Sequence, residues 1–311
     1  MIEDNAIKQT PRERVDTRII SPHVLEEDVG SDQLRPLRFE EFIGQSSLCS
    51  RLKIFIQAAN QRRESLDHVL LSGPPGLGKT TFAKIISNEM ASGFVVTSGP
   101  AIERQGDLAA ILTNLAPRDV LFIDEIHRLK LPVEEILYSA MEDYKLDIVV
   151  GKGPDARTLR IDLPPFTLVG ATTKSGLLSA PLRDRFGISG VFEYYNNEEL
   201  SQVLRRSATI LKMELDYDAS LELASRSRGT PRIANRLLRR VRDVIQVEGK
   251  SKIDFLSAQS ALDTLLVNER GLEPLDLKIL KILNDTEDFR DRKSTRLNSS
   301  HSQQSRMPSS A

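Results

Sequence analysis

The residues with the clearest chemical role lie in GPPGLGKT, residues 73–80, which fits the phosphate-binding pattern G-x-x-x-x-G-K-[ST]. Glycines let backbone N–H groups approach an anion closely, because no Cβ stands in the way. An apolar run precedes the motif and a helical run follows it, so the positive end of a helix would face the same anion. We expect Lys79 to reach the β- and γ-phosphates of a nucleoside triphosphate and the Thr80 hydroxyl to bind Mg²⁺. An ordinary Gly/Pro loop is the weaker alternative, because the whole pattern is matched between a strand and a helix.

A second motif, VLFIDEIH at 120–127, ends an apolar run in two carboxylates. Asp124 is expected to bind Mg²⁺ through water, and Glu125 to polarise the attacking water as a general base. The alternative is a strand that ends in solvated carboxylates. For His127, local packing at a helix start is favoured over a role in the site. TTKSG at 172–176 lacks the aspartate of a guanine-reading motif, so the sequence favours adenine over guanine.

Short apolar runs and helical patterns alternate from Leu34 to about Gly190. The runs HVLLS, FVVTS, DVLFID and FTLVGATT are typical of strands that are buried on both faces of a parallel sheet. Strands that alternate with helices indicate βαβ units, so the predicted fold class is α/β. From about Glu198 the spacing is helical throughout, which predicts a smaller, all-helical second domain without strands.

Composition describes an ordinary globular chain. The 311 residues are 40% hydrophobic and 28% charged, with a formal net charge of −1, so any contact with nucleic acid must be local or supplied by a partner. The single cysteine, Cys49, excludes a disulfide within the chain and fits a reducing compartment. The first residues lack the pattern of a signal peptide, and no apolar run is long enough to span a membrane. A cytoplasmic protein is expected.

Longer strings carry a family resemblance that covers most of the chain, from about Leu34 to Leu283. Together with the two motifs above, MEDYKLDI (141–148), IDLPPFTL (161–168), PLRDRFG (181–187) and GTPRIANRLLRR (229–240) resemble the RuvB family, the AAA+ motors of bacterial Holliday-junction branch migration. The resemblance implies a P-loop domain with a five-stranded parallel sheet, followed by a small helical lid domain. It also implies a hexameric ring with ATP and Mg²⁺ at the subunit interfaces.

The resemblance also assigns catalytic roles. Thr173 matches the first sensor of the γ-phosphate. Arg185 matches the arginine finger, which reaches the neighbouring subunit's γ-phosphate and stabilises charge in the transition state, and Arg183 would support the nucleotide or the interface. Without the family context, a surface ion pair of these arginines with Asp184 would be favoured.

The lid domain is expected to contribute Arg232 as a second sensor. Thr230 can cap a helix whose first residue is Pro231, and Arg232 would project from its first turn. Since this arginine belongs to another domain, hydrolysis could tilt one domain against the other. The arginines that follow are expected to form a solvated or subunit-contacting face, with a DNA patch as the alternative. They are Arg236, Arg239, Arg240 and Arg242.

For the base, Leu34, Arg35 and Ile43 are implied to flank the adenine, and Tyr195 to close the pocket from the far side. The full set of implied ATP contacts is Leu34, Arg35, Ile43, Gly73, Gly76, Leu77, Gly78, Lys79, Thr80, Thr81, Glu142, Asp143, Tyr144, Arg183, Tyr195 and Arg232.

A β-hairpin is predicted near 145–163, with a Gly-Pro turn. In the family this hairpin docks on the partner RuvA, and Leu146, Ile148 and Val150 would present one apolar face. An internally packed hairpin is the alternative. The other implied partners are RuvC in a resolution complex and the duplex arms of a four-way junction, with no membrane.

The expected domains are a flexible arm (1–33), the AAA+ ATPase domain (34–195), the lid (196–270) and the start of a winged-helix DNA-binding domain (271–291). The serine-rich residues 292–311 are interpreted as a disordered, non-native tail, with a natural flexible tail as the alternative. Because only the first helix of the winged-helix domain is recognisable, weak direct duplex binding is expected. Two other functions stay open: a clamp-loader-like ATPase, and a nucleotide-controlled assembly module without turnover.

Overall fold

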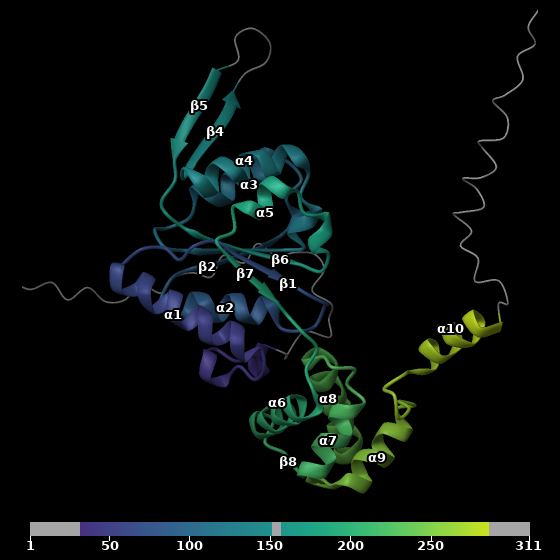
Figure 1. Ribbon diagram of the computed structural model, residues 1–311. Coiled ribbons are helices and arrows are strands. Elements are labelled where there is room, and N and C mark those ends of the chain that lie inside the picture. Colours follow the sequence, from purple (N-terminus) through teal and green to yellow (C-terminus); the bar gives the residue numbers. More distant parts are fainter. Residues whose placement is uncertain (1–31, 151–156, 286–311) are drawn as a thin grey trace, which may run out of the picture.

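The computed structural model describes residues 32–150 and 157–285 (Figure 1). The predicted N-terminal arm, the Gly-Pro turn of the hairpin and the predicted non-native tail lie outside these residues, Asp32 and Gln33 of the arm excepted.

The core of the larger domain is a five-stranded parallel sheet with the strand order β2-β3-β6-β1-β7. Its strands are β1 Val69–Ser72, β2 Phe94–Ser98, β3 Val120–Asp124, β6 Thr167–Thr172 and β7 Ile188–Val191. The predicted α/β class with a parallel sheet of five strands is therefore confirmed. The three central strands are almost completely buried, as their continuous apolar runs predict.

Helices cover both faces of this sheet (Figure 1). On one face lie α1 Ser46–Arg62 and α2 Lys79–Glu89, and on the other lie α3 Gln105–Thr113, α4 Leu131–Glu142 and α5 Ala180–Asp184. Strand β3 shows how the layers are built. Its residues alternate between the core cluster of α1 and α2 and the cluster of α3 and α4. This packing fixes the carboxyl ends of β1, β3 and β6 at one edge of the sheet.

Two buried side chains hold the sheet to its loops. Asp119 accepts hydrogen bonds from the backbone N–H groups of Gly93 and Ala116, each at 2.9 Å. His68 Nδ1 accepts from the Leu168 N–H at 2.9 Å, so Nε2 carries the proton and donates to the Met141 carbonyl at 3.0 Å. Burial lowers the pKa of His68, which is therefore held neutral.

The smaller domain is mainly helical. Its helices are α6 Asn197–Ile210, α7 Tyr217–Ser225, α8 Pro231–Val247 and α9 Phe255–Thr264. The expectation that it lacks strands is wrong, because β8 Glu214–Leu215 and β9 Lys252–Ile253 form a short parallel pair. With two residues each, these strands are too short to produce an alternating pattern in the sequence.

Helix α8 begins at Pro231 as predicted, but the predicted side-chain cap is wrong. The Thr230 hydroxyl donates to the Ser227 carbonyl at 3.3 Å and makes no capping bond. A proline at the first helical position lacks an N–H group, so one fewer donor needs an acceptor.

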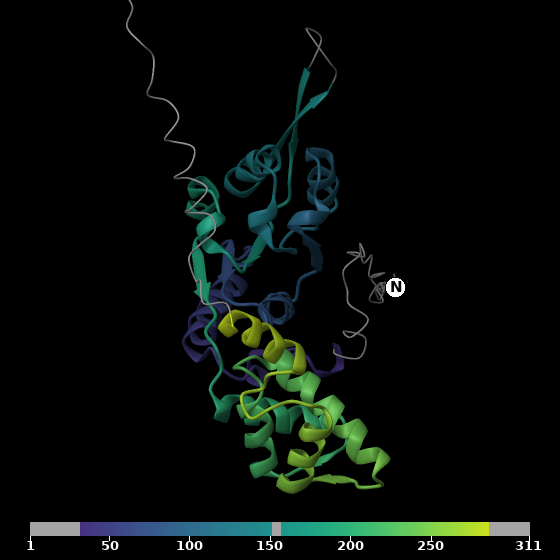
Figure 2. The ribbon, with the colours of Figure 1, turned by 90° about the vertical axis from the view of Figure 1, so that its right-hand side faces the viewer.

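The predicted hairpin is present as β4 Lys145–Val150 and β5 Arg157–Asp162, and it projects away from the sheet (Figure 2). The predicted apolar face is wrong at its base. Leu146 is fully buried in the core cluster of α4, whereas Leu159 is 53% exposed. The base of the hairpin is therefore anchored in its own domain.

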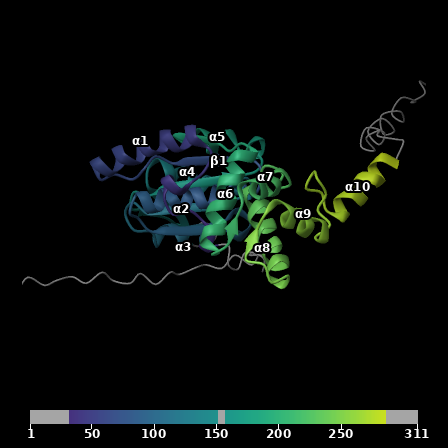
Figure 3. The ribbon, with the colours of Figure 1, turned by 90° about the horizontal axis from the view of Figure 1, so that it is seen from below.

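Helix α10 Pro274–Asp285 follows the lid and extends beyond α9, as Figures 1 and 3 show. Two ion pairs join this part of the chain to the lid: Arg228 with Asp276 of α10 at 2.8 Å, and Arg236 with Glu273, the residue before α10, at 2.7 Å. Among the described residues, no helix has the length and apolar character that a membrane crossing requires.

Candidate nucleotide site

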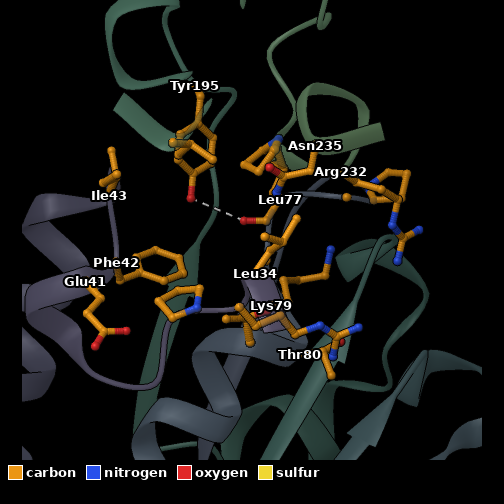
Figure 4. Close-up of a pocket in the computed structure, with 18 of the residues that line it drawn as sticks. Leu34, Glu41, Phe42, Ile43, Leu77, Lys79, Thr80, Tyr195, Arg232 and Asn235 are labelled. Atoms are coloured by element: carbon orange, nitrogen blue, oxygen red, sulfur yellow. Dashed lines mark hydrogen bonds between the residues drawn. The ribbon is translucent and has the colours of Figure 1, made fainter. Parts of the chain in front are cut away.

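A pocket lies where the carboxyl ends of β3 and β6, the phosphate-binding loop (residues 73–80) and the lid domain meet. Its fourth wall is the segment 34–43, which we call the N-terminal strap. Figure 4 shows side chains from the loop, the strap and the lid pointing into this space. In parallel α/β sheets, ligands bind at this edge.

The phosphate-binding loop adopts backbone angles that are readily accessible only to glycine. Gly73 and Gly76 have φ values of 139° and 81°, in a region that side chains disfavour. A Cβ on Gly73 would lie 2.6 Å from the Phe192 carbonyl oxygen, and one on Gly76 would lie 3.3 Å from Arg232 Cβ. The loop thus packs against the residue that follows β7 on one side and against the lid on the other, as a close-fitting anion cradle requires.

Lys79, the first residue of α2, places a cation inside this loop. Its Nζ donates to the carbonyl oxygens of Gly73 at 2.7 Å and Pro74 at 2.8 Å. Burial lowers the pKa of the ammonium group, while nearby Asp124 and Glu125 act in the opposite direction. A buried cation beside backbone N–H groups at a helix N-terminus fits a phosphate group.

Asp124 ends β3 and lines the pocket together with Thr80. Burial raises the pKa of its carboxyl group, so the folded chain favours a cation next to it. In the described ranges no group of three or more His, Cys, Asp or Glu residues is placed to hold a metal ion. One carboxylate and one hydroxyl instead fit Mg²⁺, which keeps several waters and binds substrate phosphates.

Glu125 has a left-handed backbone, with φ 49°, and its N–H donates to Asp124 Oδ1 at 2.9 Å. The Thr173 hydroxyl lies 3.4 and 3.3 Å from the two Glu125 oxygens. Thr173 follows β6, the neighbour of β3, so the sheet brings the predicted base and the predicted sensor together.

His127 also contacts Glu125, which the sequence interpretation did not foresee. Its Nε2 lies 3.2 Å from Glu125 Oε2, and its Nδ1 lies 2.9 Å from the Thr172 hydroxyl. Since a carboxylate only accepts, Nε2 carries the proton and Nδ1 accepts from Thr172. The hydroxyl in turn accepts from the Lys174 N–H at 3.0 Å. The only signal in the sequence was a histidine two residues after Glu125.

The lid contacts the phosphate-binding loop directly. The N–H of Arg232, in the lid, donates to the Gly76 carbonyl at 3.3 Å. The hydroxyl of Tyr195, the residue directly before the lid, donates to the Leu77 carbonyl at 3.4 Å, drawn as a dashed line in Figure 4. Arg232 and Tyr195 both line the pocket. Movement of the lid would therefore change the walls of the site.

The lid also binds the N-terminal strap. Arg206, on α6, donates to the Leu34 carbonyl at 2.7 Å and to Glu41 at 3.1 Å. The sequence interpretation missed nine residues that line the pocket: Pro36, Glu41, Phe42, Pro75, Val203, Arg206, Pro231, Asn235 and Arg239. Arg239, which the sequence analysis assigned to a solvated or subunit-contacting face, also lines the pocket.

Most of the predicted site residues meet in this pocket. Those that line it are Leu34, Arg35, Ile43, Gly76, Leu77, Gly78, Lys79, Thr80, Thr81, Asp124, Glu125, Thr173, Tyr195 and Arg232. Gly73 contributes through its bond to Lys79.

Apart from Gly73, five predicted residues lie outside the pocket of their own chain: Arg183, Arg185, Glu142, Asp143 and Tyr144. Glu142 binds Arg185 at 2.9 Å, and Tyr144 packs edge-on against a buried phenylalanine. Arg183 donates to carbonyl groups in the preceding turn. The structure therefore does not bring the predicted ATP contacts at 142–144 to the other nucleotide residues within one protomer.

A P-loop on a five-stranded parallel sheet, an acidic β3 end and a helical lid that faces the loop define a P-loop ATPase of the AAA+ class. Comparison with known families narrows this class. A family model described as "Holliday junction DNA helicase RuvB P-loop domain" matches residues 34–192, and one described as "RuvB AAA lid domain" matches residues 195–268. The chain belongs to the RuvB family.

Individual relatives agree. The chain is 58% identical over 269 residues to the "Holliday junction branch migration complex subunit RuvB" of Kosmotoga olearia. The aligned region covers 86% of this chain and 79% of the relative. The solved Thermotoga maritima RuvB Holliday junction branch migration motor is 49% identical, with a TM-score of 0.73 over 80% of this chain and 78% of that one. A mutant of the Thermotoga maritima protein gives a TM-score of 0.74 over 79% of both chains.

Proposed function

We propose that this chain is an ATP-driven motor that moves the branch point of Holliday junctions, as a hexameric ring in complex with a RuvA-type partner. The observation that carries the proposal is one pocket in which the P-loop, the carboxylates of β3 and an arginine of the lid domain converge. Family membership supports the same conclusion, because relatives named as branch-migration subunits share this architecture.

ATP is the proposed substrate. Its phosphates would lie on the loop glycines and Lys79, and its base would lie between the strap residues Leu34 and Ile43 on one side and Tyr195 on the other. Apolar and aromatic surfaces on both sides suit a flat base. This assignment rests on the pocket lining and on the depth at which Lys79 sits.

Glu125 is the proposed general base. The Thr173 hydroxyl and the His127 imidazole both contact its carboxylate and hold it in place. The carboxylate can therefore accept a proton from a water molecule in one fixed direction. Thr80 and Asp124 are the proposed Mg²⁺ ligands, and the ion would neutralise charge on the phosphates.

The site is proposed to be completed by the next subunit. Arg185 lies outside the pocket of its own chain, which fits a finger that acts on a neighbour. Arg183 lies two residues before Arg185, and Glu142 contacts Arg185 at 2.9 Å. Arg183 and residues 142–144 are therefore proposed to approach the neighbour's nucleotide. Arg232 would respond to the γ-phosphate in its own chain and tilt the lid, which already contacts Gly76.

We propose three domains with these roles. The domain of residues 34–195 hydrolyses ATP, residues 196–270 form the lid, and residues 271–291 begin a DNA-binding domain. The hairpin at 145–163 is the proposed docking site for RuvA. RuvC in a resolution complex and the duplex arms of a four-way junction are the further proposed partners, with weak direct duplex binding by this chain.

The test is ATP turnover with the RuvA-type partner alone, with four-way junction DNA alone, and with both. We expect stimulation only when both are present. Stimulation by primed duplex DNA instead would favour a clamp-loader-like ATPase, and assembly with ATP but no turnover would favour the assembly module.

A further inference from the structure

The short helix α5 is fixed to helix α4 by a buried carboxylate. Ser179 precedes α5 and caps it, since its Oγ accepts from the Leu182 N–H at 3.3 Å. The same hydroxyl donates to Glu134 Oε2 at 2.7 Å, and the Tyr138 hydroxyl donates to that oxygen at 2.9 Å. Glu134 is only 6% exposed. A buried carboxylate requires such donors, so the three side chains form one connected unit.

Arg185, directly after α5, lies on this unit. Its guanidinium carbon is 4.7 Å from the centre of the Tyr138 ring, within the range of a cation–π contact. One terminal nitrogen donates to the Pro181 carbonyl at 2.8 Å, and the other donates to Glu142 at 2.9 Å. Glu142 is 63% exposed at its side chain, so solvent screens this ion pair. Besides this screened ion pair, the aromatic ring and the Pro181 carbonyl support the guanidinium plane.

We propose that Tyr138 is a positioning residue for Arg185: its ring, held by Glu134 and Ser179, orients the guanidinium toward the neighbouring subunit. The proposal rests on the proposed role of Arg185 as the arginine finger. Ordering a free arginine side chain costs conformational entropy. A ring that already holds the guanidinium in place reduces the entropy that Arg185 must lose when it reaches the transition state. Tyr138 itself lies outside the nucleotide pocket and need not touch ATP.

The test compares Tyr138→Leu, which removes the ring, with Tyr138→Phe, which keeps the ring and removes only the hydroxyl. We expect Tyr138→Leu to lower kcat for ATP about 3- to 30-fold with KM nearly unchanged. Tyr138→Phe should retain kcat within about threefold, because the cation–π contact remains. The matched control is Tyr217→Leu, which changes an exposed tyrosine of the lid domain that contacts Glu198.

Rings assembled from two variants show whether Tyr138→Leu displaces Arg185 or impairs the whole subunit. Tyr138→Leu subunits have intact pockets, and Glu125→Gln subunits have intact fingers. Their mixture should turn over ATP faster than the sum of the two proteins alone, because some interfaces combine one of each. Absence of this gain would overturn the inference, and so would a Tyr138→Leu protein with the parental kcat.

The same design tests the finger separately. Arg185→Ala mixed with Glu125→Gln should show the same gain. If Arg185→Ala alone keeps the parental turnover, the finger assignment fails. If Arg185→Ala behaves as expected but Tyr138→Leu does not, only the role of Tyr138 fails. Should Tyr138→Leu not fold, Tyr138→Met removes the aromatic face with a similar volume and is held to the same outcomes.

Discussion

Replacing His127 by alanine tests whether Glu125 must be held in place to act as the base. The His127 side chain is 6% exposed and connects Glu125 to the Thr172 hydroxyl through its two ring nitrogens. A hydrogen bond to a charged group contributes about 1.5–3 kcal/mol. Because the Glu125 side chain is 33% exposed, screening reduces the expected value to about 1–2 kcal/mol.

A loss of this size in the transition state predicts a kcat about 5- to 30-fold lower, since about 1.4 kcal/mol corresponds to a factor of ten. KM for ATP should change less than about twofold, because His127 does not line the pocket. Steady-state phosphate release measures both constants. The control is His127→Gln, whose amide can still donate to Glu125 and should recover part of kcat.

Thermal unfolding of both variants separates catalysis from folding. The reasoning would be refuted by a folded His127→Ala protein that keeps the parental kcat, or by one whose KM alone rises. In either case the contact between His127 and Glu125 would not contribute to the chemical step.

Arg206→Ala removes the hydrogen bonds from the lid to the N-terminal strap, so KM for ATP should rise about 3- to 10-fold with kcat retained; an unchanged KM in steady-state kinetics would argue against the strap as a wall of the site. Asp119→Ala leaves two backbone N–H groups without their acceptor and should lower the free energy of unfolding by about 1–3 kcal/mol in urea titrations; a smaller loss than about 0.5 kcal/mol would contradict this. The buried His68 stays neutral when folded, whereas the unfolded chain takes up a proton there as the pH falls through the ordinary pKa of 6.5. The contribution of His68 to the free energy of unfolding is thus fully present above that pH and lost below it. Between about pH 7.5 and 5.5, the free energy of unfolding should therefore fall less steeply in His68→Gln than in the parental protein. Equal slopes for the two proteins would contradict the neutral assignment.

Much of the fold could be predicted because local patterns determined it. Strands β1, β2, β3 and β6 appear as apolar runs, and the phosphate-binding motif marks the turn from β1 into α2. The edge strand β7 produced no such run, since its buried positions alternate and one of them is Gly190. A Cβ on Gly190 would lie 2.8 Å from a Leu48 side-chain carbon, so packing of α1 requires a residue with no strand preference.

The site shows the same division between local and long-range information. Lys79, Asp124 and Glu125 belong to contiguous motifs and were predicted with their chemistry. Arg206 and Arg239 belong to the lid, and only the fold of two domains against each other brings them to the pocket. The error at Leu146 has the same origin, because alternation along a strand does not say which face its own helix α4 covers.

The central claim is that two protomers build one catalytic site, with the pocket from one and Arg185 from the next. The most direct measurement is ATP turnover per protomer over a dilution series, with the mass of the assembly determined by light scattering at each concentration. The account predicts that turnover per protomer falls on dilution in parallel with the loss of the assembly. Full turnover per protomer in a sample that is entirely monomeric would contradict it.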